Sequence, residues 1–329
     1  MNARPGAART LQLGLIIAGV ALFAWLVRSI GVAELLADLR GFGLAIVAVI
    51  AFELVVDACN TMAWRRILPP SRPIGFWRLY WVRQAGVAIN QLTPTATVGG
   101  EVAKAMLLRP WLPTATTAAS LVAARMSYAL GQATIVVLGL SAILGRVKDT
   151  PDLATAIIGG FLFTLGGVLG FVWLQRRGIF ATAIASVRRL GLDGTLIERL
   201  VAGGAALDTE LAAFYRDRPG AFAQSVAWHV VGQLVGLLQL AFILAKLGIP
   251  VSLATCLALE AFALVLDSAA FFVPARIGVQ EAGRVLVFTT FGLSAATGLT
   301  VAVIVRLNQL AVAGIGLTAF AALSMRSAR

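Results

Sequence analysis

Long apolar runs dominate this sequence and limit what it can fold into. Several approach the roughly 20 residues that a helix needs to cross the hydrocarbon core of a bilayer: 11–27, 42–64, 115–144, 153–174, 220–245 and 295–323. In lipid each span must satisfy its own backbone hydrogen bonds, and these runs are too long for barrel strands. With only 13% of residues charged, the sequence predicts an all-α polytopic membrane protein, in which residues 1–329 form a single integral membrane domain with about six full spans.

Two further apolar regions, residues 79–108 and 251–291, are interrupted near their middle. The interruptions read "LTPTATVGGE" and "FFVPARIGVQE", and each contains a proline and at least one glycine, the residues that most readily end a helix. Each region is therefore predicted to form a broken, re-entrant-type helical hairpin that enters and leaves on one side of the membrane. The sequence leaves open whether its arms cross the membrane halfway or fully.

Positive charge predicts the orientation. The chain has 27 Lys and Arg against 15 Asp and Glu, a net charge of +12. Basic loops of membrane proteins face the cytoplasm and contact anionic lipid headgroups, so no nucleic-acid partner is expected. Arginines concentrate in both ends, in residues 65–78 and in residues 176–218, which predicts a bacterial inner-membrane protein with both termini in the cytoplasm. Within this pattern, residues 178–218 are predicted to form a cytoplasmic amphipathic connection.

The two interrupted regions coincide when the sequence is shifted by 180 positions. The coinciding residues are a proline, a glutamate and a cation: Pro94 with Pro274, Glu101 with Glu281, and Lys104 with Arg284. Downstream, Arg125 and Arg306 lie at nearly the same depth of the next span, with one residue of slippage. We interpret this as an internal duplication, with repeat A at about 42–144 and repeat B at about 220–323. One crossing, 153–174, separates the repeats, so they are predicted to be inverted.

Inverted repeats with broken helices are typical of alternating-access carriers, whose substrate site lies at the breaks. The predicted substrate-binding residues are the polar, charged and helix-breaking members of the hairpins and the two mid-span arginines. They are Asn90, Gln91, Thr93, Pro94, Gly99, Gly100, Glu101, Lys104, Arg125, Pro274, Arg276, Gly278, Gln280, Glu281, Arg284 and Arg306. Other ionisable residues in or beside apolar runs are Glu53, Asp57, Arg83, Glu260 and Asp267.

The roles of these residues stay open at this level. Glu101 and Glu281 are each placed to cap a half-helix or pair with a cation, and equally to couple protons or contact substrate. Arg125 and Arg306 are each expected to face the bundle interior and find an anion, because a mid-span guanidinium costs at least about 2.5 kcal/mol on insertion scales. That anion is either the hairpin glutamate or a substrate phosphate, which arginine recognises well.

The sequence contains no motif for metal binding, redox chemistry or nucleotide binding. Cys59 and Cys256 have no partner spacing, and His229 is the one histidine, predicted to be a packed polar residue. No nucleotide-binding fingerprint and no catalytic triad is present. We therefore expect no metal, no cofactor and no catalytic residues, and a protein that is not an enzyme.

The motifs "NQLTPTATVGGE" and "PARIGVQEAG" resemble the hairpins of the flippase-like family related to the transmembrane region of lysylphosphatidylglycerol synthases. The stretch "FFVPARIGVQEAGRVLVFTTFGL" is similar to the hopanoid-biosynthesis-associated branch. Ala275 and Arg276 depart from the small residues usual after the proline, which puts the geometry and charge of the second hairpin in doubt. The family's synthases also carry a soluble transferase domain that this sequence does not contain, so synthesis of an aminoacyl lipid is not expected.

The resemblance implies lipid handling. The leading hypothesis is a flippase or transporter that moves an anionic or isoprenoid lipid by alternating access: an aminoacyl-phospholipid, a polyprenyl-phosphate-linked sugar or a hopanoid. An enzyme with Glu101 or Glu281 as general base is one alternative. The other is a non-transporting scaffold for lipid or cell-envelope biosynthesis, whose segment 178–218 holds a biosynthetic partner enzyme. The sequence does not predict an oligomeric state.

Overall fold

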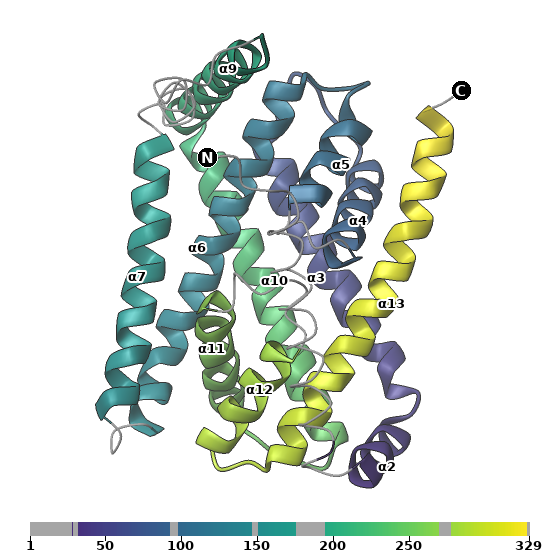
Figure 1. The fold of residues 1–329 in the computed structure, drawn as a ribbon, viewed down its shortest axis with the longest axis vertical. Helices are drawn as coiled ribbons and strands as arrows, with labels where there is room; N and C mark the ends of the chain where they lie inside the picture. The colour runs from purple at the N-terminus through teal and green to yellow at the C-terminus, as the bar shows by residue number, and fades with distance from the viewer. Residues whose placement is uncertain are drawn as a thin grey trace.

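The structure, a computed structural model, describes residues 28, 32–92, 98–146, 151–175, 195–269 and 278–327. Its elements in these ranges are α-helices joined by turns (Figure 1). The all-α prediction is thus confirmed for the described part of the chain. The predicted span at residues 11–27 lies outside it.

Among the described residues, four helices are long and apolar enough to cross a membrane. They are α3 (Ala45–Ile67), α6 (Thr114–Arg146), α10 (Pro219–Lys246) and α13 (Ala295–Ser327), which match four predicted spans. A further helix, α7 (Pro151–Gln175), covers the predicted span 153–174. These helices run the length of the molecule in Figure 1. Prolines begin α7 and α10, where a missing N–H costs nothing.

Each interrupted region forms a pair of shorter helices. The first contains α4 (Phe76–Leu92) and α5 (Val98–Leu108), and the second contains α11 (Leu253–Ala269) and α12 (Val279–Thr290). The second arms have 11 and 12 residues and rise about 16 to 18 Å, which is too short for a hydrocarbon core of about 30 Å. In Figure 1, α4 and α5 lie in the upper half of the molecule and α11 and α12 in the lower half.

Each hairpin packs on a long helix from the other half of the chain. The centre is formed by α3 and α10, which lie along one another. Helix α4 packs on α13, and α11 packs on α6. Each hairpin also has its own apolar cluster: Leu79, Val82 and Leu108 belong to the first, and Leu259, Phe262 and Phe288 to the second. The hairpins are thus built into the bundle from opposite ends.

Two helices lie at the ends of the bundle. Helix α2 (Val32–Phe42) is at the lower end of Figure 1 and is joined to α13 by a 2.8 Å hydrogen bond from Thr300 to Asp38. Helix α9 (Thr195–Asp217) is at the upper end and packs on α6 and α10. It forms residues 195–217 of the predicted connection 178–218, whose residues 178–194 lie outside the described ranges.

Large apolar side chains cover the outer surface. Leu44, Met106 and Phe163 are 87%, 69% and 83% exposed. Soluble monomers rarely expose contiguous apolar surface of this kind, whereas a bilayer stabilises it. The surface therefore agrees with a protein embedded in lipid.

Candidate functional site

The two arms of the first hairpin touch through their backbones. The side-chain oxygen of Asn90 on α4 accepts a 2.6 Å hydrogen bond from the Gly100 N–H in the first turn of α5. A Cβ on Gly100 would overlap the Gly86 carbonyl oxygen, and a Cβ on Gly86 would lie 2.8 Å from the Gly100 carbonyl oxygen. Glycine at both positions therefore lets the half-helices close, while Asn90 satisfies an orphan N–H at the break.

Glu101 follows in the same first turn, where a carboxylate complements the positive end of the helix dipole. Its Oε1 accepts a 2.8 Å hydrogen bond from Lys104 Nζ, three residues along the same face. Lys104 is buried and its ammonium lies 5.9 Å from the centre of the Trp64 ring. The Glu101 side chain is 37% exposed, so one carboxylate oxygen is satisfied within the helix and the group stays accessible.

In the second hairpin the glutamate has different hydrogen-bond partners. Gly278 begins α12 with a φ of 78°, a conformation that favours glycine. Its N–H donates to Glu281 Oε2 at 2.7 Å, while Glu281 Oε1 accepts from Arg306 Nη2 at 2.6 Å and Nε at 3.0 Å. The Glu281 side chain is only 3% exposed. Glu281 is thus at once a helix cap and the partner of a cation on α13.

The two mid-span arginines are not equivalent. Arg306 binds the hairpin glutamate, one of the two anions that the sequence left open, and also donates to Gln309 Oε1 at 3.3 Å. Arg125 is exposed, and its guanidinium carbon lies 5.9 Å from the centre of the Tyr128 ring. Of the two anions that the sequence left open for Arg125, the hairpin glutamate is not its partner in this structure, because Lys104 engages Glu101 from within the same helix. No described carboxylate forms an ion pair with Arg125.

The remaining predicted residues vary in placement. Arg284 is half-buried on α12, and Glu281 pairs with Arg306 on α13 rather than with Arg284 three residues away. Gln91 is exposed, whereas Gly99 and Gln280 are half-buried. Four predicted residues lie outside the described ranges: Thr93, Pro94, Pro274 and Arg276.

A polar group on α3 joins both halves of the bundle. Asp57 is buried, forms an ion pair with Arg83 on α4 and accepts a 2.7 Å hydrogen bond from Gln84 Nε2. One turn earlier, Glu53 Oε2 accepts from Gln239 Nε2 of α10 at 3.5 Å and from Asn308 Nδ2 of α13 at 3.3 Å.

Glu53, Asp57 and Arg83 were recognisable from the sequence as ionisable residues outside the predicted binding set, whereas the amides Gln84, Gln239 and Asn308 were not predicted. The signal that could have found the amides is their presence in apolar spans, where an unpartnered amide is costly. His229 is a buried, packed residue, as predicted: its Nδ1 lies 2.9 Å from the side-chain oxygen of Asn60 on α3.

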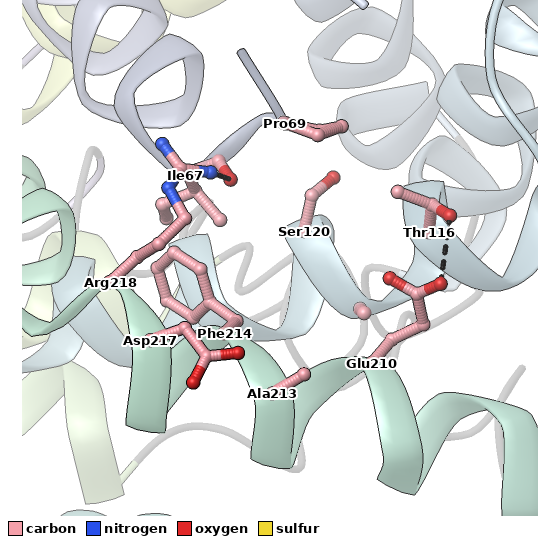
Figure 2. A pocket seen from close by; sticks show the side chains of 10 residues that line it. Ile67, Pro69, Thr116, Ser120, Glu210, Ala213, Phe214, Asp217 and Arg218 are labelled. Atoms are coloured by element: carbon pink, nitrogen blue, oxygen red, sulfur yellow. Dashed lines mark hydrogen bonds between the residues drawn. The ribbon is translucent and has the colours of Figure 1, made fainter. Parts of the chain in front are cut away.

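A pocket of about 180 Å³ opens at the upper end of the bundle, between the end of α3 and helices α6 and α9 (Figure 2). On one side of it Thr116 donates to Glu210 at 3.2 Å, and on the other Arg218 donates to the carbonyl oxygens of Arg66, Ile67 and Leu68 at the end of α3. Partial burial lowers the pKa of Arg218 from its ordinary value. Because it donates to these carbonyl oxygens, the Arg218 guanidinium caps the end of α3 rather than binding a ligand in the pocket.

Within the described residues, no group of three or more His, Cys, Asp or Glu side chains could hold a metal ion. Cys59 and Cys256 are buried thiols on different helices. What the centre of the molecule offers instead is a set of carboxylates, cations and amides around two helix breaks. Such a set can bind a charged headgroup or a small cation.

The fold and these sites define a multi-pass α-helical membrane protein built around two broken helical hairpins. The chain belongs to the family of the lysylphosphatidylglycerol synthase TM region, whose family model matches residues 11–316. That membership ties the protein to lipid handling and confirms the family resemblance found in the sequence; the hopanoid-associated branch stays a prediction. No curated protein and no solved structure matches the chain.

Proposed function

We propose that this protein moves an anionic or isoprenoid lipid across the bacterial inner membrane by alternating access. The observation that carries the proposal is the pair of broken hairpins entering the bundle from opposite ends, each with a glutamate in the first turn after the break (Figure 1). Irregular backbone at membrane depth is tolerated where protein or a wet cavity satisfies it, and carriers place their substrate there.

The crosswise packing supports two inverted repeats as the basis of the movement. Under the 180-residue shift α4 corresponds to α11 and α6 to α13, so the contacts of α4 with α13 and of α11 with α6 are the same contact made twice. Each hairpin therefore packs against the last helix of the opposite half. Rocking one half against the other would open one hairpin as it closes the other.

The charges favour a phosphate-bearing headgroup. On the side of the first hairpin Arg125 is exposed and forms no ion pair with a described carboxylate, and it lies within electrostatic reach of Lys104. A guanidinium offers a fork of donors that suits phosphate. In the proposed cycle the headgroup binds beside Arg125, while the lipid tails stay against the apolar outer surface.

Charge and aromatic residues support an orientation in which the upper end of the bundle faces the cytoplasm. Arg65, Arg66, Arg72 and Arg78 are exposed at the end of α3 and the start of α4, where Trp77 is 66% exposed. Basic residues face the cytoplasm, and tryptophans favour the membrane interface. The C-terminal end of α13 lies at this same end in Figure 1, which supports a cytoplasmic C-terminus.

The test is lipid movement in liposomes that contain the purified full-length protein. Fluorescent phosphatidylglycerol, its aminoacyl form, a polyprenyl-phosphate-linked sugar and a hopanoid are each offered, and a quencher added outside measures the fraction exposed on the outer leaflet. At least one lipid should cross faster than in protein-free liposomes. Arg125→Ala should slow it about tenfold or more, since a phosphate contact made by arginine is worth roughly 1.5 to 3 kcal/mol.

Arg109→Ala is the matched control. Arg109 is an exposed arginine in the turn after α5, away from the helix breaks, so its loss should leave the rate unchanged. Equal slowing by both variants would show that only general surface charge is being measured. If none of the four lipids moves, the proposal is refuted for these lipid classes.

A scaffold is the second candidate, and the pocket beside α9 is the observation that favours it. The pocket presents Glu210 and Asp217 at the upper end of the bundle (Figure 2). A biosynthetic partner held there would be lost on Glu210→Lys with Asp217→Lys, while lipid movement in liposomes would persist. Co-purification of membrane partners with each form separates the two functions.

A further inference from the structure

Glu53 is a carboxylate near the middle of a membrane span whose described hydrogen-bond partners are all amides. Its Oε2 accepts from Gln239 at 3.5 Å and from Asn308 at 3.3 Å, both long bonds. An ionised carboxylate in such a place is costly unless a cation balances it. No described cation forms an ion pair with Glu53.

The nearest cation is already committed. Arg83 forms its ion pair with Asp57, one turn along α3 on the same face, and Gln84 donates to the second oxygen of Asp57. The group therefore contains two carboxylates and one guanidinium. One additional positive charge would make it neutral.

The surrounding amides indicate that a proton is missing from this group, because two of their oxygens have no described donor. Asn308 and Gln84 are 2% and 0% exposed, and each donates its N–H to one of the two carboxylates. Their carbonyl oxygens, Asn308 Oδ1 and Gln84 Oε1, are buried and accept no hydrogen bond from any described group. Buried acceptors almost always have a donor. A protonated carboxyl has an O–H donor of the kind that this cluster lacks.

We infer that Glu53 is the coupling site of the transporter: it carries one proton in the conformation seen here and exchanges it during the lipid-moving cycle. This inference rests on the proposed function and names the ion that the cycle uses. Glu53 is half-buried, whereas Asp57, Gln84 and Asn308 are buried. Of this cluster, Glu53 is thus the carboxylate best placed to meet water and exchange a proton when the helices move.

The packing against α3 brings few other titratable groups to this point. Asp57 is on the same helix, Arg83 and Tyr80 come from α4, and Tyr128 comes from α6. From α10, His229 binds Asn60, and from α13, Arg306 binds Glu281. Arg306 is thus engaged by Glu281, whereas His229 is engaged through Nδ1 alone and its Nε2 is buried without a described partner. A change in the charge of Glu53 would therefore act first on the Asp57–Arg83 pair.

A first experiment detects the proton without needing transport. Infrared spectra of the purified protein in lipid at pH 7 report the carbonyl stretch of protonated carboxyl groups. Glu53→Gln, which copies the neutral acid, should remove one such band, and so should Glu53→Met. Glu210→Gln, which removes an exposed carboxylate at the upper end, should leave the band in place. A wild-type spectrum that E53Q and E53M do not change would overturn the inference.

A second experiment measures coupling in the liposome assay. A pH gradient should speed wild-type lipid movement severalfold in one direction, and E53Q should respond equally with and without it. Wild-type movement that ignores pH but follows a sodium gradient would replace the proton with Na⁺ and refute the assignment. Absence of any lipid movement would refute the transport function alone, because the infrared band tests the protonation of Glu53 independently of transport.

Discussion

The two hairpins place a glutamate at the same point of the same break, yet they bind it in different ways. Glu101 pairs with Lys104 inside its own half-helix and keeps a side chain that is 37% exposed. Glu281 reaches across to Arg306 on α13 and is 3% exposed. The glutamate of the second hairpin thereby fastens α12 to a full-length helix, whereas the glutamate of the first stays within its own half-helix; that hairpin is tied to α3 by the Arg83–Asp57 pair and closed by backbone contact between its arms.

The difference teaches which half is available to a ligand in this conformation. An ion pair between helices must break before α12 can leave α13, while the first hairpin has a cation beside it, Arg125, that no described carboxylate neutralises. In an alternating cycle the two arrangements would exchange. The conformation described here then has its first hairpin ready for an anion and its second hairpin closed.

The largest contrast is expected when each glutamate is removed. Glu281→Ala leaves half-buried Arg306 without its anion and the Gly278 N–H without its acceptor, and should lower the free energy of unfolding by about 3 to 5 kcal/mol. Glu101→Ala leaves buried Lys104 without its anion but with its contact to the Trp64 ring, and should cost about 1 to 2 kcal/mol. Unfolding by a denaturing detergent in mixed micelles measures both.

A charge-free pair is the control for that contrast. Replacing Glu281 and Arg306 together by methionine removes the charge imbalance, so the double variant should recover most of the stability lost in Glu281→Ala. A double variant no more stable than the single one would show that the ion pair is not what fastens the hairpin.

The next contrast concerns the glycines that bring the arms together. Gly100→Ala places a methyl group against the Gly86 carbonyl oxygen and should cost about 1 to 3 kcal/mol by overpacking. Gly283→Ala in α12 puts its methyl group 3.9 Å from the nearest Leu266 carbon, an ordinary contact, and should be nearly neutral. Thermal unfolding of both variants in the same lipid compares them directly. Equal midpoints would mean that the first hairpin does not depend on close backbone approach.

The helices and their breaks could be predicted because lipid makes those features local. A span must hydrogen-bond within itself, so an apolar run predicts a helix, and a proline with glycines predicts its interruption. Helices α3, α6, α10 and α13 accordingly begin and end within a few residues of the predicted spans. The position of Glu281 in the first turn after its break was also evident from the repeat.

The partners could not be predicted in the same way, because they depend on which helices meet. The register of the repeat puts Arg284 three residues from Glu281, yet the approach of α13 supplies Arg306 instead. Glu53 likewise meets Gln239 and Asn308, which are 186 and 255 residues away in the sequence. Spacing along one helix carries no information about such contacts.

The smallest effect on stability, and the sharpest on function, is expected at Arg125. Arg125→Gln breaks no ion pair to a described carboxylate, so the free energy of unfolding should change by no more than about 0.5 kcal/mol. Arg306→Gln, its counterpart in the second repeat, leaves Glu281 buried and should be far less stable. Binding of a fluorescent anionic lipid to purified protein should show the reverse order at first contact, with Arg125→Gln losing affinity at unchanged stability. If Arg125→Gln instead unfolds as readily as Arg306→Gln, then both arginines are structural and the two hairpins are closed alike.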